Sequence, residues 1–166
     1  MSSFQTNDID QPTVANSSLM PIETGSPIMR VGLVACVKAK QDHAAPAGEL
    51  YRSPLFRKAS AYCAATYDRW AILSAKHGLI WPDTQIAPYD ETLKDKPIAE
   101  RREWARKVLE QLAAWEADTG MKPVYYFHAG RYYSEYLVAG LANRAEVPLQ
   151  GLGIGKLLAW YTERGF

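Results

Sequence analysis

The sequence is poor in cysteine, has little excess charge and lacks long apolar runs, and each shortage narrows the class of protein. Only two cysteines occur in 166 residues, Cys36 and Cys63, too few for the disulfide framework of a small secreted domain. No apolar run of about 18 residues is present, as a membrane-spanning helix requires, and no charged-then-apolar leader is visible. These absences predict a reduced, cytoplasmic protein with no membrane contact.

The first 29 residues differ in composition from the rest. They are rich in Ser, Thr, Asn, Asp and Pro, hold Asp8, Asp10 and Glu23, and contain no Lys or Arg. A segment without helical or strand periodicity buries too little apolar surface to offset the entropy lost on ordering. We therefore expect a flexible N-terminal tail over 1–29. The 19 basic and 15 acidic groups of 30–166 give a net charge of +4, a modest excess that suits contact with phosphate.

Residues 30–166 alternate between strand-like apolar runs and amphipathic, helix-like stretches. Their length and the apolar content of 48% suit a single domain. The pattern predicts strands at 31–37, 69–74 and 124–127, and helices at 53–67, 98–117, 131–143 and 157–162. This alternation is typical of a mostly parallel sheet flanked by helices. We predict a single α/β catalytic domain.

The segment 77–97 shows no clear periodicity. About twenty such residues in a compact domain usually form a functional or disordered loop. Apolar and aromatic side chains along the segment can anchor it, which favours an ordered, functional loop. These residues are Trp81, Pro82, Ile86, Pro88, Tyr89 and Leu93.

Three polar clusters each follow a predicted strand. They are Cys36–Lys40, Ser74–Gly78 and His128–Tyr132. Because the carboxyl ends of neighbouring parallel strands open into one crevice, segments far apart in sequence can build one site there. We expect that crevice to hold the chemistry.

The first and third clusters favour an anionic ligand. Lys38 and Lys40 are two residues apart, so one faces the crevice and the other faces away if the strand continues, whereas a turn lets both point at an anion. The structural alternative is that both belong to a solvated loop. His128 precedes a predicted helix with Arg131 in its first turn, and the first N–H groups of a helix attract anions. Phosphate is the first ligand to test.

The second cluster offers donors and a titratable ring. Ser74 can donate through its hydroxyl, Lys76 adds a cation and His77 adds an imidazole. Gly78 permits close backbone approach or simply makes a turn.

Carboxylates on loops are the candidates for catalysis. Asp90 follows Pro88-Tyr89, while Asp83 follows Trp81-Pro82. A carboxylate beside aromatic surface can stabilise an oxocarbenium-like sugar or activate water. We rank Asp90 first, because Asp83 is better explained as the cap of a turn.

Other catalytic classes fit less well. The spacing of Cys36 and the three histidines matches no zinc pattern, so we expect no metal. Ser74 lacks a G-x-S-x-G turn. The run Gly151–Lys156 matches neither a dinucleotide fingerprint nor a phosphate-binding P-loop, and we expect no cofactor.

Several linked motifs resemble the domain-of-unknown-function family 6884, a relative of the YaaA peroxide-stress and DNA-binding proteins. The resemblance covers about Val31 to Trp160. The motifs are Lys38 after the first strand, Leu50-Tyr51-x-Ser53-Pro54-x-Phe56, Leu73 to Leu79, Pro82-Asp83, Ile86 and Pro88-Tyr89-Asp90-x-Thr92-Leu93. The chain departs from its relatives at Ala35, where they suggest Ser, and at His77, where Tyr is usual.

The resemblance implies work on modified bases in DNA. The wider group is similar to Brig-type antiphage DNA glycosylases, which remove glucosylated hydroxymethylcytosine from phage DNA. A base must leave the stack to be reached. Asp90 would then stabilise the sugar cation or orient water, His77 or His128 would hydrogen-bond the departing base, and Lys76 or Lys38 would serve a less favoured Schiff-base route.

The expected substrate contacts extend around the catalytic groups. Tyr51, Trp81 and Tyr89 are candidates to stack on the base, and Lys38, Lys40, Lys76 and Arg131 could hold phosphates. Further substrate-binding candidates are Ser53, Ser74, Gly78 and His128.

Three functions remain open at this point. The first is a DNA glycosylase acting on DNA with modified bases. The second is an enzyme on free modified nucleotides or nucleosides, and the third a DNA-binding stress protein without catalysis. No obligate protein partner is inferred.

Overall fold

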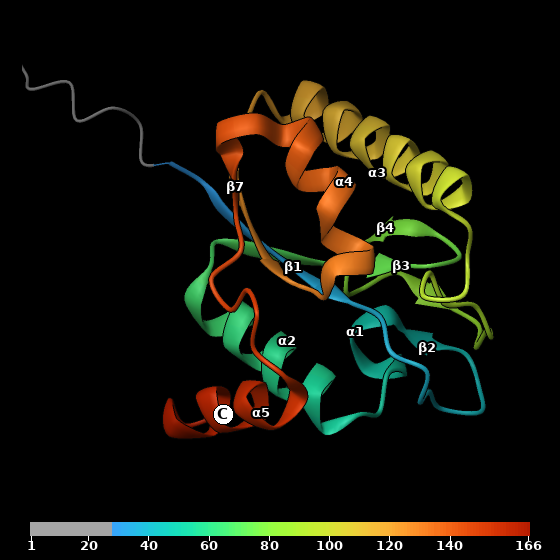
Figure 1. Ribbon diagram of the computed structural model, residues 1–166, viewed down its shortest axis with the longest axis vertical. Helices are drawn as coiled ribbons and strands as arrows, with labels where there is room; N and C mark the ends of the chain where they lie inside the picture. The colour runs from blue at the N-terminus through green and yellow to red at the C-terminus, as the bar shows by residue number, and fades with distance from the viewer. Residues whose placement is uncertain (1–27) are drawn as a thin grey trace, which may run out of the picture.

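The computed structural model describes residues 28–166 (Figure 1). Apart from Ile28 and Met29, the predicted tail lies outside these residues. No helix formed by the described part of the chain is both long and apolar enough to cross a membrane.

A five-stranded, mostly parallel sheet forms the centre of the domain. Its strands are β1 (Arg30–Ala35), β3 (Arg69–Ser74), β4 (Gly78–Ile80), β6 (Val124–His128) and β7 (Ala145–Glu146). They lie in the order β4-β3-β1-β6-β7. Strand β1 is parallel to both β3 and β6, β6 is parallel to β7, and β4 is antiparallel to β3. The predicted α/β class with a mostly parallel sheet is confirmed.

Helices cover both faces of this sheet. On one face lie α2 (Pro54–Thr66) and α5 (Ile154–Glu163), and on the other lie α3 (Ile98–Thr119) and α4 (Arg131–Leu141) (Figure 1). Smaller elements complete the fold: β2 (Ala45–Pro46), α1 (Ala47–Leu50), β5 (Gln85–Ile86), paired with β2, and the 3₁₀ helix η1 (Ala142–Arg144).

The central strand is apolar because both of its faces are covered. Val31 and Leu33 are fully buried and Val34 nearly so, as expected for a strand between two helical layers. Gly32 allows α2 to pack closely, because a Cβ there would lie 2.6 Å from the Tyr67 ring.

The chain connections diverge between β1 and β6. From β1 the chain passes through α2 to β3 on one side, whereas from β6 it passes through α4 to β7 on the other side. The two helices lie on opposite faces (Figure 1). In such doubly wound sheets, ligands bind beyond the carboxyl ends of the strands at this switch point.

The structure differs from the predicted elements mainly in segment 77–97. This segment contains β4 and β5, which are too short to produce a detectable period. Only Ala75–His77 separates β3 from β4, a connection too short for a parallel crossover, so β4 returns antiparallel. The last helix also begins earlier than predicted, at Ile154, and α4 ends earlier, at Leu141.

Candidate functional site

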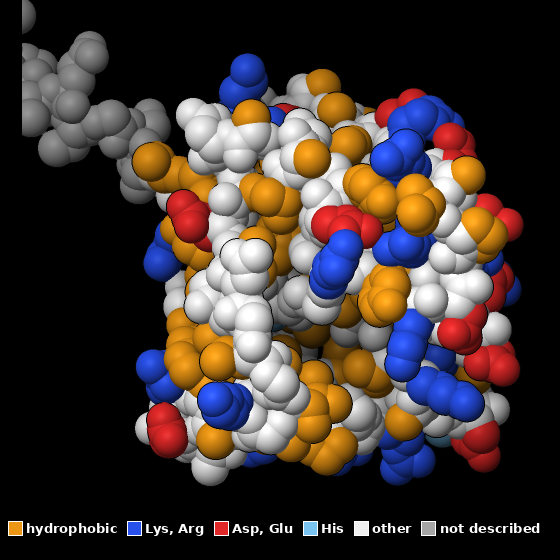
Figure 2. All heavy atoms as spheres, viewed as in Figure 1, with side chains coloured by type: hydrophobic (Ala, Val, Ile, Leu, Met, Phe, Trp, Pro, Cys, Tyr) orange, Lys and Arg blue, Asp and Glu red, His pale blue; other side chains and the backbone are white. Residues whose placement is uncertain are grey.

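A cleft of about 1530 Å³ lies at the carboxyl ends of β1 and β6. Its walls come from the end of β1, the first turn of α4, the loop before α5 and the segment that follows Tyr89. Figure 2 shows the hollow near the centre of the viewed face, with basic and acidic side chains around it. The cleft therefore lies where the sheet topology places a ligand site.

Four of the predicted site residues line this cleft. Lys38 follows β1, Asp90 belongs to the segment after Tyr89, His128 ends β6 and Arg131 begins α4. Lys38, Asp90 and Arg131 are exposed, whereas His128 is buried. Residues from three distant parts of the sequence thus meet at one site.

Both ring nitrogens of His128 are occupied by tyrosine hydroxyls. Nε2 lies 2.8 Å from the Tyr67 hydroxyl and Nδ1 lies 2.6 Å from the Tyr161 hydroxyl. Burial lowers the pKa of His128 to about 4, so the ring is neutral at pH 7, with one nitrogen donating and the other accepting. His128 therefore lacks a free nitrogen for a departing base and serves to hold the tyrosines.

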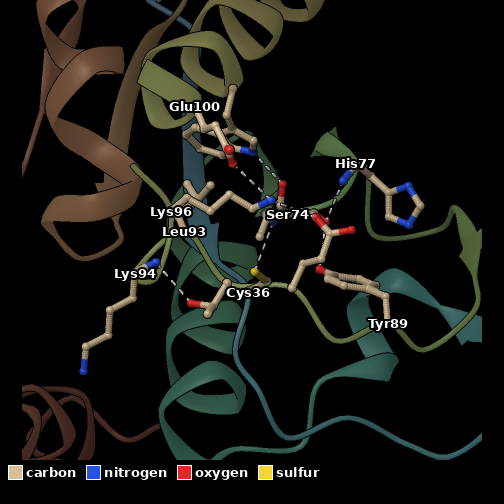
Figure 3. Close-up of polar contacts among 12 residues, drawn as sticks. Cys36, Ser74, His77, Tyr89, Leu93, Lys94, Lys96 and Glu100 are labelled. Carbon is tan, nitrogen blue, oxygen red and sulfur yellow. Dashed lines mark hydrogen bonds and ion pairs between the residues drawn. The ribbon is translucent and has the colours of Figure 1, made fainter. Parts of the chain in front are cut away.

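Three hydroxyl groups form a chain beside the cleft. Ser74 Oγ donates to the Tyr89 hydroxyl at 2.7 Å, and that hydroxyl lies 2.5 Å from the hydroxyl of Tyr51. Ser74 and Tyr51 are buried, and Ser74 Oγ also accepts the His77 N–H (Figure 3). The chain anchors Tyr89, and with it the start of the segment that carries Asp90.

Lys40 contacts the rings of Tyr51 and Tyr89, two members of this hydroxyl chain. Its Nζ lies 4.4 Å from the centre of the Tyr89 ring, a cation–π contact. Partial burial lowers the pKa of Lys40, while charge interactions with Cys36 and Asp90 act in the opposite direction. Neither Lys40 nor Tyr89 lines the cleft, although Tyr89 directly precedes Asp90, which does.

The Lys76-His77-Gly78 turn does not line the cleft. Figure 3 shows the His77 ring directed away from Ser74 and Cys36. Partial burial and the nearby Lys76 and Lys107 charges lower the pKa of His77.

Gly78 has a structural role in that turn. It has a φ of 74°, and a Cβ there would lie 2.3 Å from Gln111 Oε1. The Gln111 side chain accepts from Leu79 N–H and donates to the His77 carbonyl. A glycine is needed at position 78 because the backbone there has a positive φ and packs closely against Gln111 of α3.

Ser53 is an N-cap. Its Oγ accepts the Phe56 N–H at 3.0 Å at the start of α2, with Pro54 as the first helical residue. The residue lies outside the cleft lining, and its hydroxyl is used to begin the helix.

Charges of both signs surround the cleft in equal number. The cations are Lys38, Lys94, Lys96 and Arg131, and the carboxylates are Asp90, Glu91, Asp95 and Glu135. Arg131 Nε donates to Glu135 Oε2 at 3.0 Å, and Glu135 Oε1 accepts from Arg101 Nη1 at 2.9 Å. These arginines lower the pKa of Glu135. The exposed Arg131 guanidinium is thus held by a carboxylate yet remains accessible.

Cys36 and Tyr133, to which the sequence pattern assigned no role, also line the cleft. Cys36 Sγ accepts the Ala75 N–H and donates to the Tyr133 hydroxyl, each at 3.4 Å. The Tyr133 hydroxyl also accepts the Leu93 N–H, and burial raises the pKa of Tyr133. Its own O–H proton is therefore retained and able to donate. The only sequence signal was its position three residues beyond Gly130, in the first turn of α4.

Metal binding has no support within residues 28–166, where no group of three or more His, Cys, Asp and Glu side chains is close enough to hold an ion. Both cysteines are buried thiols. Burial raises the pKa of Cys63, so this thiol is inert.

The fold and cleft define a doubly wound α/β domain with a cleft at its switch point. The chain belongs to a family described as a family of unknown function (DUF6884), whose model matches residues 31–163. It is also similar to the uncharacterized protein YfjM of Bacillus subtilis (strain 168), with 37% identity over 70 residues. That match covers 38% of this chain and 47% of YfjM, so it spans about half of that protein's length. No solved structure matches the chain significantly.

Proposed function

We propose that this protein is a DNA glycosylase that cleaves the N-glycosidic bond of a modified base and leaves an abasic site. The observation that carries the proposal is the meeting of Asp90, Lys38 and Arg131 at one large cleft. A carboxylate is suited to a cationic sugar, and the two cations are suited to its phosphates.

The first turns of two helices support phosphate binding at this cleft. Arg131 and Tyr132 begin α4, and Gly151–Gly153 lead into α5; all of them line the cleft. Neither helix has a side-chain cap hydrogen bond, so N–H groups of their first turns are open to an anion, apart from the Tyr133 N–H, which donates to the Gly130 carbonyl at 3.0 Å. Lys38 adds a positive charge from the end of β1.

The reaction is a hydrolysis in which the bond between the sugar C1′ and the base nitrogen breaks. Positive charge develops on the sugar and is stabilised by the Asp90 carboxylate, which also orients the attacking water. The water oxygen bonds to C1′, and its proton passes to Asp90. The electron pair of the broken bond leaves with the base, which then takes up a proton.

Tyr133 replaces the histidines as the donor to the departing base. His128 has both nitrogens engaged, and His77 lies outside the cleft. The Tyr133 hydroxyl lines the cleft as a neutral donor, because burial raises its pKa.

An enzyme acting on free modified nucleotides is the second candidate. The equal number of cations and carboxylates around the cleft favours it, because a long polyanion is better bound by a broad basic surface. A cytoplasmic location suits both candidates and belongs to the same proposal.

The test compares DNA substrates that differ only in one base. Duplexes carrying cytosine, hydroxymethylcytosine or glucosylated hydroxymethylcytosine are incubated with the protein, and abasic sites and released bases are measured by alkaline cleavage and mass spectrometry. We expect release from a modified duplex only. Release from the free nucleotides but from no duplex would favour the second candidate, and binding without release would favour a DNA-binding protein without catalysis.

Asp90→Asn tests the catalytic assignment. We expect base release to fall at least about 100-fold while DNA affinity is retained, since the carboxylate acts on the transition state. Asp83→Asn is the matched control: this exposed aspartate lies on a loop outside the cleft, and its loss should leave the rate unchanged. Unchanged release in Asp90→Asn would refute the assignment.

A further inference from the structure

One exposed aromatic ring lines the cleft. Tyr132, the second residue of α4, is 41% exposed. The other aromatic lining residues are buried or half-buried, namely Phe56, Phe127, His128, Tyr133 and Tyr161. Among the described residues, Tyr132 therefore offers the cleft's most accessible π-face.

A clamped arginine supports the Tyr132 ring. The Arg101 guanidinium lies 5.0 Å from the ring centre, within cation–π range. Glu135 Oε1 accepts from Arg101 Nη1 at 2.9 Å, and the Arg101 side chain is only 13% exposed. The ring is thus held against a partly buried ion pair, and little conformational entropy remains to be lost when a ligand binds.

The predicted stacking residues lie elsewhere. Tyr51 is buried, the Tyr89 hydroxyl bonds with those of Tyr51 and Ser74, and Trp81 lines a separate hollow with Arg69. None of these three rings lines the cleft.

We infer that Tyr132 is the stacking platform for a nucleobase, with its open face toward the ligand and Arg101 behind it. The inference rests on the proposed function insofar as the ligand carries a base. It does not depend on hydrolysis. Stacking of a base on an aromatic side chain is worth about 1–3 kcal/mol, an affinity factor of about 5 to 150.

The experiment uses two probes that differ only in the base. Affinities of the full chain for deoxycytidine 5′-monophosphate and for 2-deoxyribose 5-phosphate are measured by calorimetry. We expect the nucleotide to bind at least 5-fold more tightly. Tyr132→Leu, which keeps apolar bulk but removes the ring, should abolish this difference, while Tyr132→Phe should keep it.

The next turn of the same helix provides a matched control. Tyr136 has its own arginine, Arg102, 5.3 Å from the ring centre, but it does not line the cleft. Tyr136→Leu should leave both affinities unchanged. Equal binding of the two probes by the unmodified protein, no binding of either, or an unaffected Tyr132→Leu variant would overturn the inference. Base-dependent binding through Tyr132 without base release from any DNA would instead overturn the proposed hydrolysis alone.

Discussion

At the scale of single residues, His128 shows how burial changes a role that its position indicates. A histidine at the end of a strand beside a cleft invites a catalytic interpretation. In the structure, tyrosine hydroxyls occupy both of its nitrogens and burial keeps it neutral. His128 therefore links β6 to two other parts of the fold. Its bond to Tyr161 reaches α5, and its bond to Tyr67 reaches the residue that follows α2.

This environment predicts that His128 makes folding pH-dependent. Its folded pKa of about 4 lies below the value of about 6.5 for an unfolded histidine. The unfolded chain therefore binds more protons between these values, and stability falls as the pH drops through this window. The loss from pH 7 to pH 5 should be about 2 kcal/mol, measured by denaturant unfolding at each pH.

Two variants separate His128 from other titrating groups. His128→Gln should have a lower free energy of unfolding at pH 7 than the parent protein, but this free energy should fall less between pH 7 and pH 5. His43→Gln alters an imidazole whose side chain is 69% exposed, and it should keep the slope of the parent protein. If the free energy of unfolding changes with pH by the same amount in the parent protein and in His128→Gln, the prediction is wrong.

At the scale of elements, the start of α2 shows a motif with a structural purpose. The Ser53-Pro54 pair begins the helix, and the Ser53 hydroxyl caps it. The helix then carries Leu55, Phe56 and Ala59 to the cleft wall. Ser53 thus shapes the site indirectly.

Ser53→Ala should lower the free energy of unfolding by about 1 kcal/mol, because the Phe56 N–H loses its partner. Ligand affinity under conditions where the variant is folded should be unchanged. Ser60→Ala, which removes a hydroxyl bonded only to the Arg57 carbonyl, should not destabilise the helix. Lost affinity with unchanged stability in Ser53→Ala would instead return Ser53 to the substrate site.

The segment from Tyr89 to Leu93 is held at both ends. Tyr89 enters the hydroxyl chain, and Leu93 is fully buried with its N–H on Tyr133. The residues between them, Asp90–Thr92, line the cleft. A long loop with aromatic anchors was predictable from the sequence. Its anchoring partners are Ser74 of β3, Tyr51, which follows α1, and Tyr133 of α4. Only tertiary packing brings these residues together.

At the scale of the whole molecule, the charges around the cleft predict how the proposed DNA binding responds to salt. Each neutralised phosphate contributes about 0.9 to the slope of log affinity against log salt concentration. Lys38→Ala should therefore reduce the slope by about that amount. The measurement is a titration of labelled duplex at several salt concentrations.

Lys122→Ala is the matched control for this measurement. Lys122 precedes β6 and is exposed, so it lies at the amino ends of the strands, at the opposite edge of the sheet from the cleft. Removing the Lys122 side chain should leave the slope of log affinity against log salt concentration unchanged. A slope that changes equally in both variants would show that DNA does not enter through the cleft.

The order and type of the main elements were determined by the sequence alone. Buried strands produce continuous apolar runs, and covered helices produce stripes, so β1, β3, β6 and the long helices were predictable, as was the crevice beyond the strands. The family match over 31–163 confirms the resemblance.

Only the tertiary structure decided which polar side chains face that crevice. Lys38, Asp90 and Arg131 do, whereas His77, Ser74 and Tyr51 do not line it. The physical reason is that local patterns report the period of burial along one element. A hydrogen bond such as that between His128 and Tyr161 depends on how separate elements pack, and no local pattern encodes it.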